Sequence, residues 1–182
     1  RMKEDFTNIM VHELRAPLAA VKDSSELMIE SKKLTETERQ ELLSIINSQS
    51  KVLLGEITDL LDAAKIEAGK FLINKKADDL GKVISQTVKT FFPMSEKKGA
   101  TISSRIPPLP PVLFDRLRIT QVLNNLISNS LKFTPSGGEI KVEAKIERNF
   151  AKVSVSDTGI GIPIDKQKEV FSKFYQVGTV EH

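Results

Sequence analysis

The sequence contains no cysteine. This absence excludes disulfide bonds and thiolate chemistry, and it suits a protein of the reducing cytosol. No apolar run approaches the roughly 18 residues that a membrane-spanning helix requires, and no signal peptide is recognisable. Of the 182 residues, 40% are hydrophobic and 28% are charged, so we expect a soluble globular protein with one large domain or two small ones.

A basic stripe is also missing. The formal net charge is only +3, and the lysine and arginine residues are spread along the chain rather than clustered. Proteins that bind the backbone of nucleic acids usually gather positive charge on one face. We therefore expect no nucleic-acid partner.

The first third of the chain has the apolar periodicity of two long helices, over residues 2–30 and 36–67. Thr35 followed by Glu38 is a capping-box pattern that opens the second helix, and Gly69 is suited to end it.

The second of these helices contains a heptad seam, in which apolar and small residues alternate at steps of three and four. The seam consists of Leu43, Ile46, Ser50, Leu53, Ile57, Leu60 and Ala64. One hairpin cannot also bury the flanking stripe of Leu42, Ile45 and Val52. We therefore expect a second copy of the chain to complete a four-helix bundle.

After residue 70 the pattern changes to a mixture of strands and helices. Gly99 is placed to close one helix and Asp115 to cap another, and a turn at Arg148 and Asn149 predicts a hairpin with one buried face. The expected strands are residues 71–74, 100–106, 112–114, 139–147 and 151–157, and the expected helices are residues 80–98 and 116–133. This mixture predicts a separate α+β domain.

The segment NNLISNSLK places Asn125, Asn129 and Lys132 on one face of a predicted helix. Two amide oxygens and an ammonium group could hold a magnesium ion and the phosphates that it bridges, because Mg²⁺ prefers oxygen ligands. Considered alone, these residues fit a solvated helix face better.

The segment DTGIGI follows a predicted strand directly. Gly159 and Gly161 would let the backbone approach a ligand closely. Asp157 could accept a hydrogen bond from the amino group of adenine, whereas guanine presents a carbonyl oxygen there. A strand that ends in an Asp-Gly turn is common, so this motif alone is weak. The aromatic segment FSKFYQV, residues 171–177, fits a core or a nucleotide lid equally well.

His12 stands in an apolar helical stretch, VHELRAPLAAV. It does not belong to an H-E-x-x-H zinc motif, because Ala16 takes the place of the second histidine. His12 is either a polar residue on a bundle surface or a nucleophile. A neutral imidazole, abundant near pH 7, can attack a phosphoryl group while Glu13 holds or accepts the proton of the other ring nitrogen. The only other histidine is the terminal His182.

Four segments together resemble the motifs of the two-component sensor histidine kinases. VHELRAPLAAV resembles the family's H box, and RITQVLNNLISNSLKFTPSGG, residues 118–138, resembles its N box. DTGIGI resembles the first glycine box, and FSKFY, residues 171–175, the F box. The segments occur in the family's order and cover essentially the whole chain. The resemblance is therefore specific, although each motif alone is weak.

The resemblance implies that His12 is the phosphoacceptor and that Glu13 is the assisting base. In the implied ATP site, Asn125 and Asn129 bind Mg²⁺ and Lys132 contacts the phosphates. Asp157 hydrogen-bonds to adenine, and Phe133, Gly159 and Gly161 line the pocket. The implied activity is ATP-dependent autophosphorylation of His12, followed by transfer to an aspartate of a response regulator.

The implied architecture is α+β. Residues 1–69 would be a dimerisation and histidine phosphotransfer domain, in which two helical hairpins form a four-helix bundle. Residues 70–182 would be the ATP-binding domain, an α/β sandwich of the Bergerat type. We expect a homodimer, a receiver-domain partner and a cytoplasmic location. Family members are often anchored to a membrane through N-terminal segments, which would precede Arg1 here.

The chain departs from the family pattern in two places. The family has a second glycine box and further strands after the F box, whereas this sequence ends at His182, so we expect an ATP-binding domain truncated at its C-terminal end and a reduced kinase activity. Ala16 stands where family members with strong phosphatase activity have Thr or Asn, so we expect weak phosphatase activity. Pro17 fits the H box, and because it cannot donate to the carbonyl of residue 13 it should loosen the helix beyond His12.

Two alternatives stay open. An ATPase of the gyrase or chaperone type would share the nucleotide pocket, but it would lack the helical bundle with its histidine. A dimeric scaffold that no longer uses ATP would not need Asn125, Asn129 and Asp157, although the missing C-terminal part would suit it.

Overall fold

The computed structural model describes residues 2–31 and 33–170 of the chain. They fall into two compact units, one within Arg1–Phe71 and the other within Leu72–His182. A helical hairpin comes first, and a domain of mixed strands and helices follows it. This order confirms the predicted fold class of a hairpin followed by an α/β sheet domain.

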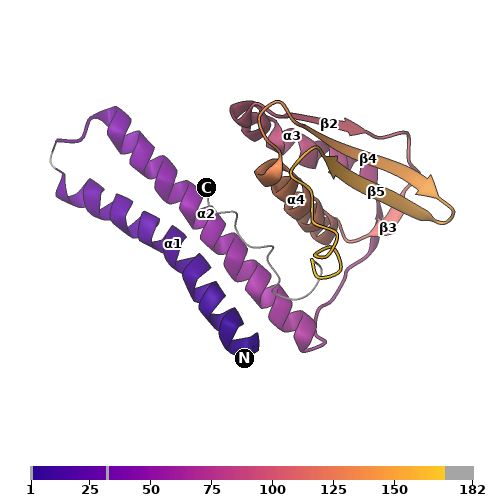
Figure 1. Cartoon of the computed structure of the whole chain (residues 1–182), viewed down its shortest axis with the longest axis horizontal. Coiled ribbons are helices and arrows are strands. Elements are labelled where there is room, and N and C mark those ends of the chain that lie inside the picture. Colours follow the sequence, from indigo (N-terminus) through magenta and orange to yellow (C-terminus); the bar gives the residue numbers. More distant parts are fainter. Residues whose placement is uncertain (1, 32, 171–182) are drawn as a thin grey trace. The chain divides into compact units, whose positions relative to one another are not determined.

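The first unit is a hairpin of α1 (Met2–Glu30) and α2 (Glu36–Glu67), which run side by side in Figure 1. The predicted capping box opens α2. The Thr35 hydroxyl accepts from the Glu38 backbone N–H at 3.2 Å, and a Glu38 carboxylate oxygen accepts from the Thr35 backbone N–H at 2.8 Å. The bonds from the Thr35 backbone and then its hydroxyl hold the pKa of Glu38 below its ordinary value. Gly69 follows the last turn with a φ of 63°, which suits glycine.

The buried face of α2 has the predicted heptad period but is rotated relative to the predicted seam. Its buried and half-buried positions are Leu42, Ile46, Gln49, Leu53, Glu56, Leu60, Asp62 and Ala63. Leu43 and Ile57, which were predicted to lie in the seam, remain 49% and 39% exposed. One residue step turns a helix by about 100°, and two apolar stripes share Ile46, Leu53 and Leu60. Periodicity could not decide which stripe faces α1.

The buried positions of α1 follow the matching heptad spacing. Among the α1 residues whose side chains are described, 11 and 14–30, the buried or half-buried ones are Leu14, Pro17, Ala20, Val21, Ser24, Ser25 and Met28. The chain stays helical on both sides of Pro17. The loosening of the helix beyond His12 remains a prediction.

The second unit is built on a three-stranded sheet in the order β2-β4-β5, where β2 pairs with β4 in parallel and β4 pairs with β5 in the antiparallel sense. The strands are β2 (Thr101–Arg105), β4 (Glu139–Glu147) and β5 (Phe150–Asp157). Two helices, α3 (Leu80–Lys98) and α4 (Arg116–Phe133), pack against the sheet (Figure 1).

The core of this unit lies between the two helices and the sheet. Ile84 of α3, Ile127 of α4, and Ile140 and Val142 of β4 have no exposed surface. Along β4 the buried residues alternate with exposed ones, as the period of two in the sequence predicted. Gly99 ends α3 with a φ of 72°, in agreement with its predicted role as a helix stop.

A second, two-stranded sheet corrects one predicted strand. Residues 71–74 form no strand; the strand is instead β1 (Lys76–Asp78), which pairs antiparallel with β3 (Val112–Phe114). The backbone N–H of Asn74 donates to the carboxylate of Asp115 at 2.8 Å, and Leu72 is 85% exposed. The prediction of a strand at residues 71–74 was therefore wrong. The Asn74 N–H bonds to the side chain of Asp115, 41 residues later, and not to a neighbouring strand.

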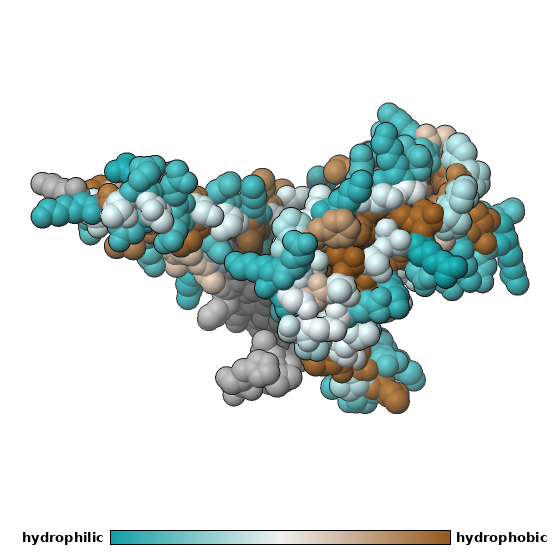
Figure 2. Space-filling model, turned by 90° about the horizontal axis from the view of Figure 1, so that it is seen from above, coloured by the Kyte–Doolittle hydropathy of each residue, from teal (hydrophilic) through white to brown (hydrophobic). Residues whose placement is uncertain are grey.

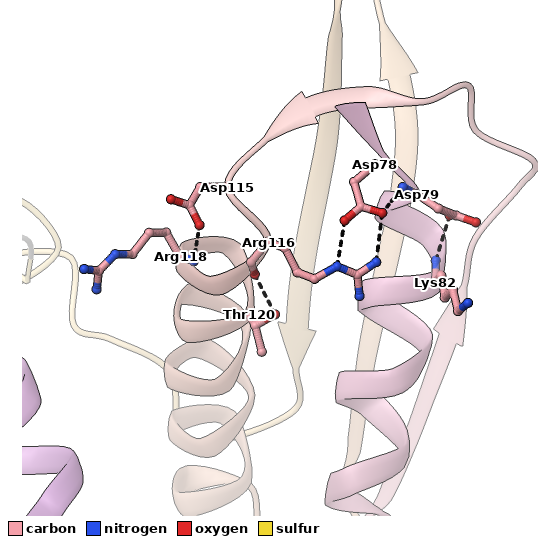
Figure 3. A network of polar contacts seen from close by, with 7 residues as sticks. All are labelled: Asp78, Asp79, Lys82, Asp115, Arg116, Arg118 and Thr120. Carbon is pink, nitrogen blue, oxygen red and sulfur yellow. Dashed lines mark hydrogen bonds and ion pairs between the residues drawn. The ribbon is translucent and has the colours of Figure 1, made fainter. Parts of the chain in front are cut away.

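A pair of charged side chains fastens β1 to the start of α4 (Figure 3). The Arg116 guanidinium donates from Nε to Oδ2 of Asp78 at 2.6 Å and from its second nitrogen to Oδ1 at 2.8 Å. The Asp79 backbone N–H also donates to Asp78. These bonds, the one with Arg116 first, lower the pKa of the Asp78 carboxyl from its ordinary 3.8 to about 2. The two-pronged geometry fixes both side chains.

The surface is mainly hydrophilic, with hydrophobic patches between the polar side chains of the visible face (Figure 2). Among the helices of residues 2–31 and 33–170, none combines the length and the hydropathy that a bilayer crossing requires.

We expect Asp78→Asn to lower the free energy of unfolding at pH 7, because the amide cannot form the paired bond with Arg116. The Asp78 pKa is lowered to about 2 in the folded chain, so its stabilisation is present above pH 4 and fades as the pH falls through 2. Urea unfolding at several pH values should show the difference between the two chains shrinking in acid. Asp165→Asn, at an exposed position, is the control; a difference that stays constant with pH would contradict the assignment.

Candidate functional site

Helix α4 presents the two predicted amides on its outer face. Its inner residues Leu123, Ile127 and Leu131 are buried against the core, whereas Asn125 and Asn129 are exposed. Within the described part of the chain, neither side-chain amide is engaged in a hydrogen bond. Both amides are therefore available to a ligand.

Lys132 and Phe133 form the last turn of α4, next to these amides, and both are exposed. The Lys132 ammonium lies over the Phe133 ring, 5.3 Å from its centroid. A cation held over an aromatic face at a solvated site gains only about 0.5–1 kcal/mol. This contact therefore leaves Lys132 free to turn towards an anionic ligand.

Asp157 ends β5, and both oxygens of its carboxylate are held by the protein. Oδ2 accepts a hydrogen bond from the Ser130 hydroxyl at 2.9 Å, and Oδ1 accepts one from the Gly159 backbone N–H at 2.9 Å. Ser130 lies on α4, so the first bond joins the helix directly to the end of the strand. Asp157 itself is exposed to solvent.

The turn after Asp157 packs closely on the end of α4. A Cβ atom added to Gly159 would lie 2.8 Å from the carbonyl oxygen of Phe133 and 2.8 Å from Oδ1 of Asp157. Only glycine therefore fits there without a shift of the backbone. Gly161 has a φ of 70°, a conformation that side chains with a Cβ rarely adopt.

Sequence reasoning missed three polar residues that hold this arrangement. Ser130 bonds to Asp157, and the fully buried Thr134 donates its hydroxyl to the Ser130 carbonyl at 2.6 Å. The Lys98 ammonium, in the last turn of α3, donates to the carbonyls of Leu131 and Lys132. Ser130 was adjacent to Asn129 in the motif, but its partner lies 27 residues away, so only the fold could reveal it.

His12 and Glu13 belong to α1, in the first unit, and their side chains lie outside the described residues, as does the F box at residues 171–175. Ala16, one turn beyond His12, is exposed. The structure therefore brings together Asp157, Gly159 and the end of α4. The roles of His12 and Glu13 remain predictions.

The donor set fits a magnesium ion that arrives with phosphates. Within residues 2–31 and 33–170, no group of three or more histidine or acidic side chains forms a metal cage. Mg²⁺ usually keeps several waters and takes only one or two protein ligands when it is bound with phosphates. The uncommitted amide oxygens of Asn125 and Asn129 meet that requirement.

Family models match both units. The family described as His Kinase A (phospho-acceptor) domain matches residues 2–69. The family described as histidine kinase-, DNA gyrase B-, and HSP90-like ATPase matches residues 114–182. The second match indicates an ATP-binding domain.

Curated relatives match almost the whole chain. The Non-motile and phage-resistance protein of Caulobacter vibrioides is 36% identical over 97% of this chain and 22% of its own length. Signal transduction histidine-protein kinase BarA of Escherichia coli is 36% identical over 97% of this chain and 20% of its own length. Autoinducer 2 sensor kinase/phosphatase LuxQ of Vibrio parahaemolyticus is 32% identical over 96% of this chain and 21% of its own length. The chain thus spans about a fifth of the curated relatives that it matches.

Solved structures share the architecture. Full-length ShkA in complex with AMPPNP superposes with a TM-score of 0.68 at 28% identity, over 95% of this chain and 37% of that one. The histidine kinase AdeS of Acinetobacter baumannii gives a TM-score of 0.67 at 23% identity, over 88% of this chain and 78% of that one, which supports the fold alone.

We expect Gly159→Ala to lower the free energy of unfolding by about 1–3 kcal/mol, because the added methyl would overlap the Phe133 carbonyl and Asp157. Chemical denaturation of both chains measures this loss. Gly55→Ala is the control, since no atom lies within 4 Å of a Cβ there and alanine favours a helix. A Gly159→Ala chain as stable as the original would contradict the inference that a Cβ at position 159 does not fit.

Proposed function

Because this chain belongs to the two-component sensor histidine kinases, we propose that it is the kinase core of such a sensor, using ATP and Mg²⁺ to phosphorylate His12. The observation that supports this most directly is the site at the end of α4. There a held carboxylate and a glycine that admits no side chain meet the end of α4, and the exposed face of the same helix carries two uncommitted amides. The phosphoryl group would then pass to an aspartate of a response regulator.

The contacts and exposure of each predicted residue are compatible with a specific role in binding the nucleotide. Asp157 accepts a hydrogen bond from the adenine amino group, since each held oxygen keeps a free lone pair. Asn125 and Asn129 would hold Mg²⁺, which would supply positive charge to the phosphates. Lys132 would turn from the Phe133 ring to the phosphates, and Gly159 and Gly161 would let the backbone approach the nucleotide. The AMPPNP bound in the complex of ShkA supports an adenine nucleotide as the ligand.

The reaction requires a nucleophile on the helical unit. A ring nitrogen of neutral His12 attacks the γ-phosphorus of ATP, a nitrogen–phosphorus bond forms, and the bond from phosphorus to the ADP oxygen breaks. Glu13 takes or holds the proton of the other ring nitrogen. Such transfers need mainly positioning and charge stabilisation from the protein.

A second copy of the chain would complete the helical unit. Leu43, Leu54, Ile57 and Leu61 lie on one stripe of α2 at heptad-like spacing and are 39–66% exposed. A hairpin that leaves such a stripe open gains free energy by forming a four-helix bundle with a second hairpin. We therefore propose that residues 1–69 form the dimerisation and phosphotransfer domain and residues 70–182 the ATP-binding domain. We propose a cytoplasmic location for both domains, because ATP is available there.

We expect His12→Gln to abolish formation of phosphoprotein, because glutamine has no nucleophilic ring nitrogen. The chain and its variants are incubated with γ-labelled ATP and Mg²⁺, and the acid lability of the label is measured. His182→Gln, at the only other histidine, is the matched control and should keep full labelling. Label that persists in His12→Gln, or that is stable in acid, would contradict His12 as the phosphoacceptor.

Phosphatase action on a phosphorylated receiver needs a water molecule held in line with the phosphorus. Ala16 lies one turn beyond His12 on α1, and residues four apart share a helix face. Its methyl group can neither donate to nor accept from that water. We therefore propose a kinase-biased protein with weak phosphatase activity.

Ala16→Thr should accelerate dephosphorylation roughly ten- to a hundredfold, since one positioning hydrogen bond contributes about 1–3 kcal/mol. The measurement is the decay of a purified phosphorylated response regulator with each variant in the presence of ADP. Ala68→Thr, at the exposed C-cap residue of α2, is the control. Fast decay with the unchanged chain and no gain from threonine would show that another group holds the water.

A further inference from the structure

The hydroxyl of Ser130 behaves differently from the other hydroxyls of α4 and from that of its C-cap residue, Thr134. Those of Thr120, Ser128 and Thr134 each donate to a backbone carbonyl three or four residues earlier, at 2.6–3.1 Å. That local bond is the usual outcome for a hydroxyl in a helix. Ser130 instead donates to Oδ2 of Asp157, 27 residues away, although it is only 7% exposed. In this fold the Ser130 hydroxyl therefore orients the Asp157 carboxylate.

The two bonds to Asp157 fix the plane of its carboxylate. The Gly159 N–H holds Oδ1 and the Ser130 hydroxyl holds Oδ2, both at 2.9 Å. The last torsion of an aspartate side chain is otherwise broad. With only the Gly159 bond, the carboxylate could turn further about its Cβ–Cγ bond and could face a ligand in several directions. Ser130 removes that freedom.

This orientation matters for the choice of base. Adenine offers one exocyclic amino group, where guanine has a carbonyl oxygen, but guanine has two donors of its own, the ring N–H and the 2-amino group. A carboxylate that can turn is able to accept from those two donors. A carboxylate held by Ser130 cannot turn to them. The single proton of the Ser130 hydroxyl is also committed, so Ser130 offers no donor to the guanine carbonyl.

We propose that Ser130 is a specificity-determining residue, which holds Asp157 so that the site binds adenine in preference to guanine. This inference rests on the proposed function of Asp157 as the reader of adenine. Ser130 acts through Asp157 and is thus a positioning residue for the base.

The test compares three nucleotides by calorimetry in the presence of Mg²⁺: ATP, GTP and purine ribonucleoside triphosphate, which lacks the 6-amino group. The proteins are the unchanged chain, Ser130→Ala, Ser130→Cys, Ser130→Thr and Ser128→Ala. Ser128 is the matched control, because its hydroxyl lies two positions away on the same helix and bonds only to a backbone carbonyl.

We expect Ser130→Ala to weaken ATP binding about two- to tenfold, the effect of losing one hydrogen bond, and to lower the preference for ATP over GTP by at least the same factor. Binding of the nucleotide without the amino group should not change. Ser130→Thr keeps the hydroxyl and should retain the preference, and Ser130→Cys, a weaker donor, should lie between. Ser128→Ala should match the unchanged chain for all three nucleotides.

Two results would overturn the inference while leaving the proposed function intact. One is equal weakening of all three nucleotides by Ser130→Ala and Ser130→Cys, which indicates general damage to the pocket. The other is ATP binding with an unchanged ratio of ATP to GTP affinity in both variants. If the unchanged chain did not bind ATP, the proposed function and this inference would fail together.

Discussion

Ile127 is fully buried between α4 and the sheet, with Leu123 one turn before it and Leu131 one turn after it. This contact sets the rotation of α4 about its own axis. With 3.6 residues per turn, burial of these three side chains places Asn125 and Asn129 on the outer face. It also directs Ser130 to the end of β5, where Asp157 lies. The polar geometry of the site therefore depends on an apolar contact that touches no ligand.

Polar bonds fix α4 at both ends. At its start, Asp115 caps the helix by accepting from the Arg118 N–H, and it also accepts from Asn74, whose bond is the larger cause of a lowered Asp115 pKa. At its end, the carbonyls that no helical bond satisfies accept from Lys98. A positive charge at this end also suits the helix dipole. The helix is thus held in register along its axis as well as in rotation.

The helical hairpin obeys a different constraint. Its two helices are long and amphipathic, but α2 has two apolar stripes that share Ile46, Leu53 and Leu60. Packing against α1 covers one stripe and leaves side chains such as Leu43 and Ile57 of the other exposed. Burying such side chains gains roughly 1.5–3 kcal/mol each, so the uncovered stripe favours association of two hairpins. The proposed phosphoacceptor would then stand on a bundle that only a dimer completes.

The sequence alone determined most of the elements, and it supplied the candidate residues of the proposed site. Local signals were sufficient where the physics is local: the capping box at Thr35, the helix stop at Gly99 and the alternation along β4 all agree with the structure. The DTGIGI motif also identified Asp157 and Gly159 as candidate site residues, because a carboxylate at a strand end followed by glycines is recognisable from residue type and spacing.

Tertiary structure decided what depends on partners distant in sequence. The strand expected at residues 71–74 gave way to β1, because Asp115 takes the Asn74 donor and β3 offers its edge to Lys76–Asp78. The face of α2 that meets α1 could not be chosen from a period that both stripes share. Ser130 gained a role only when the fold brought α4 to the end of β5. In each case the sequence supplies the groups, and long-range packing selects which of them meet.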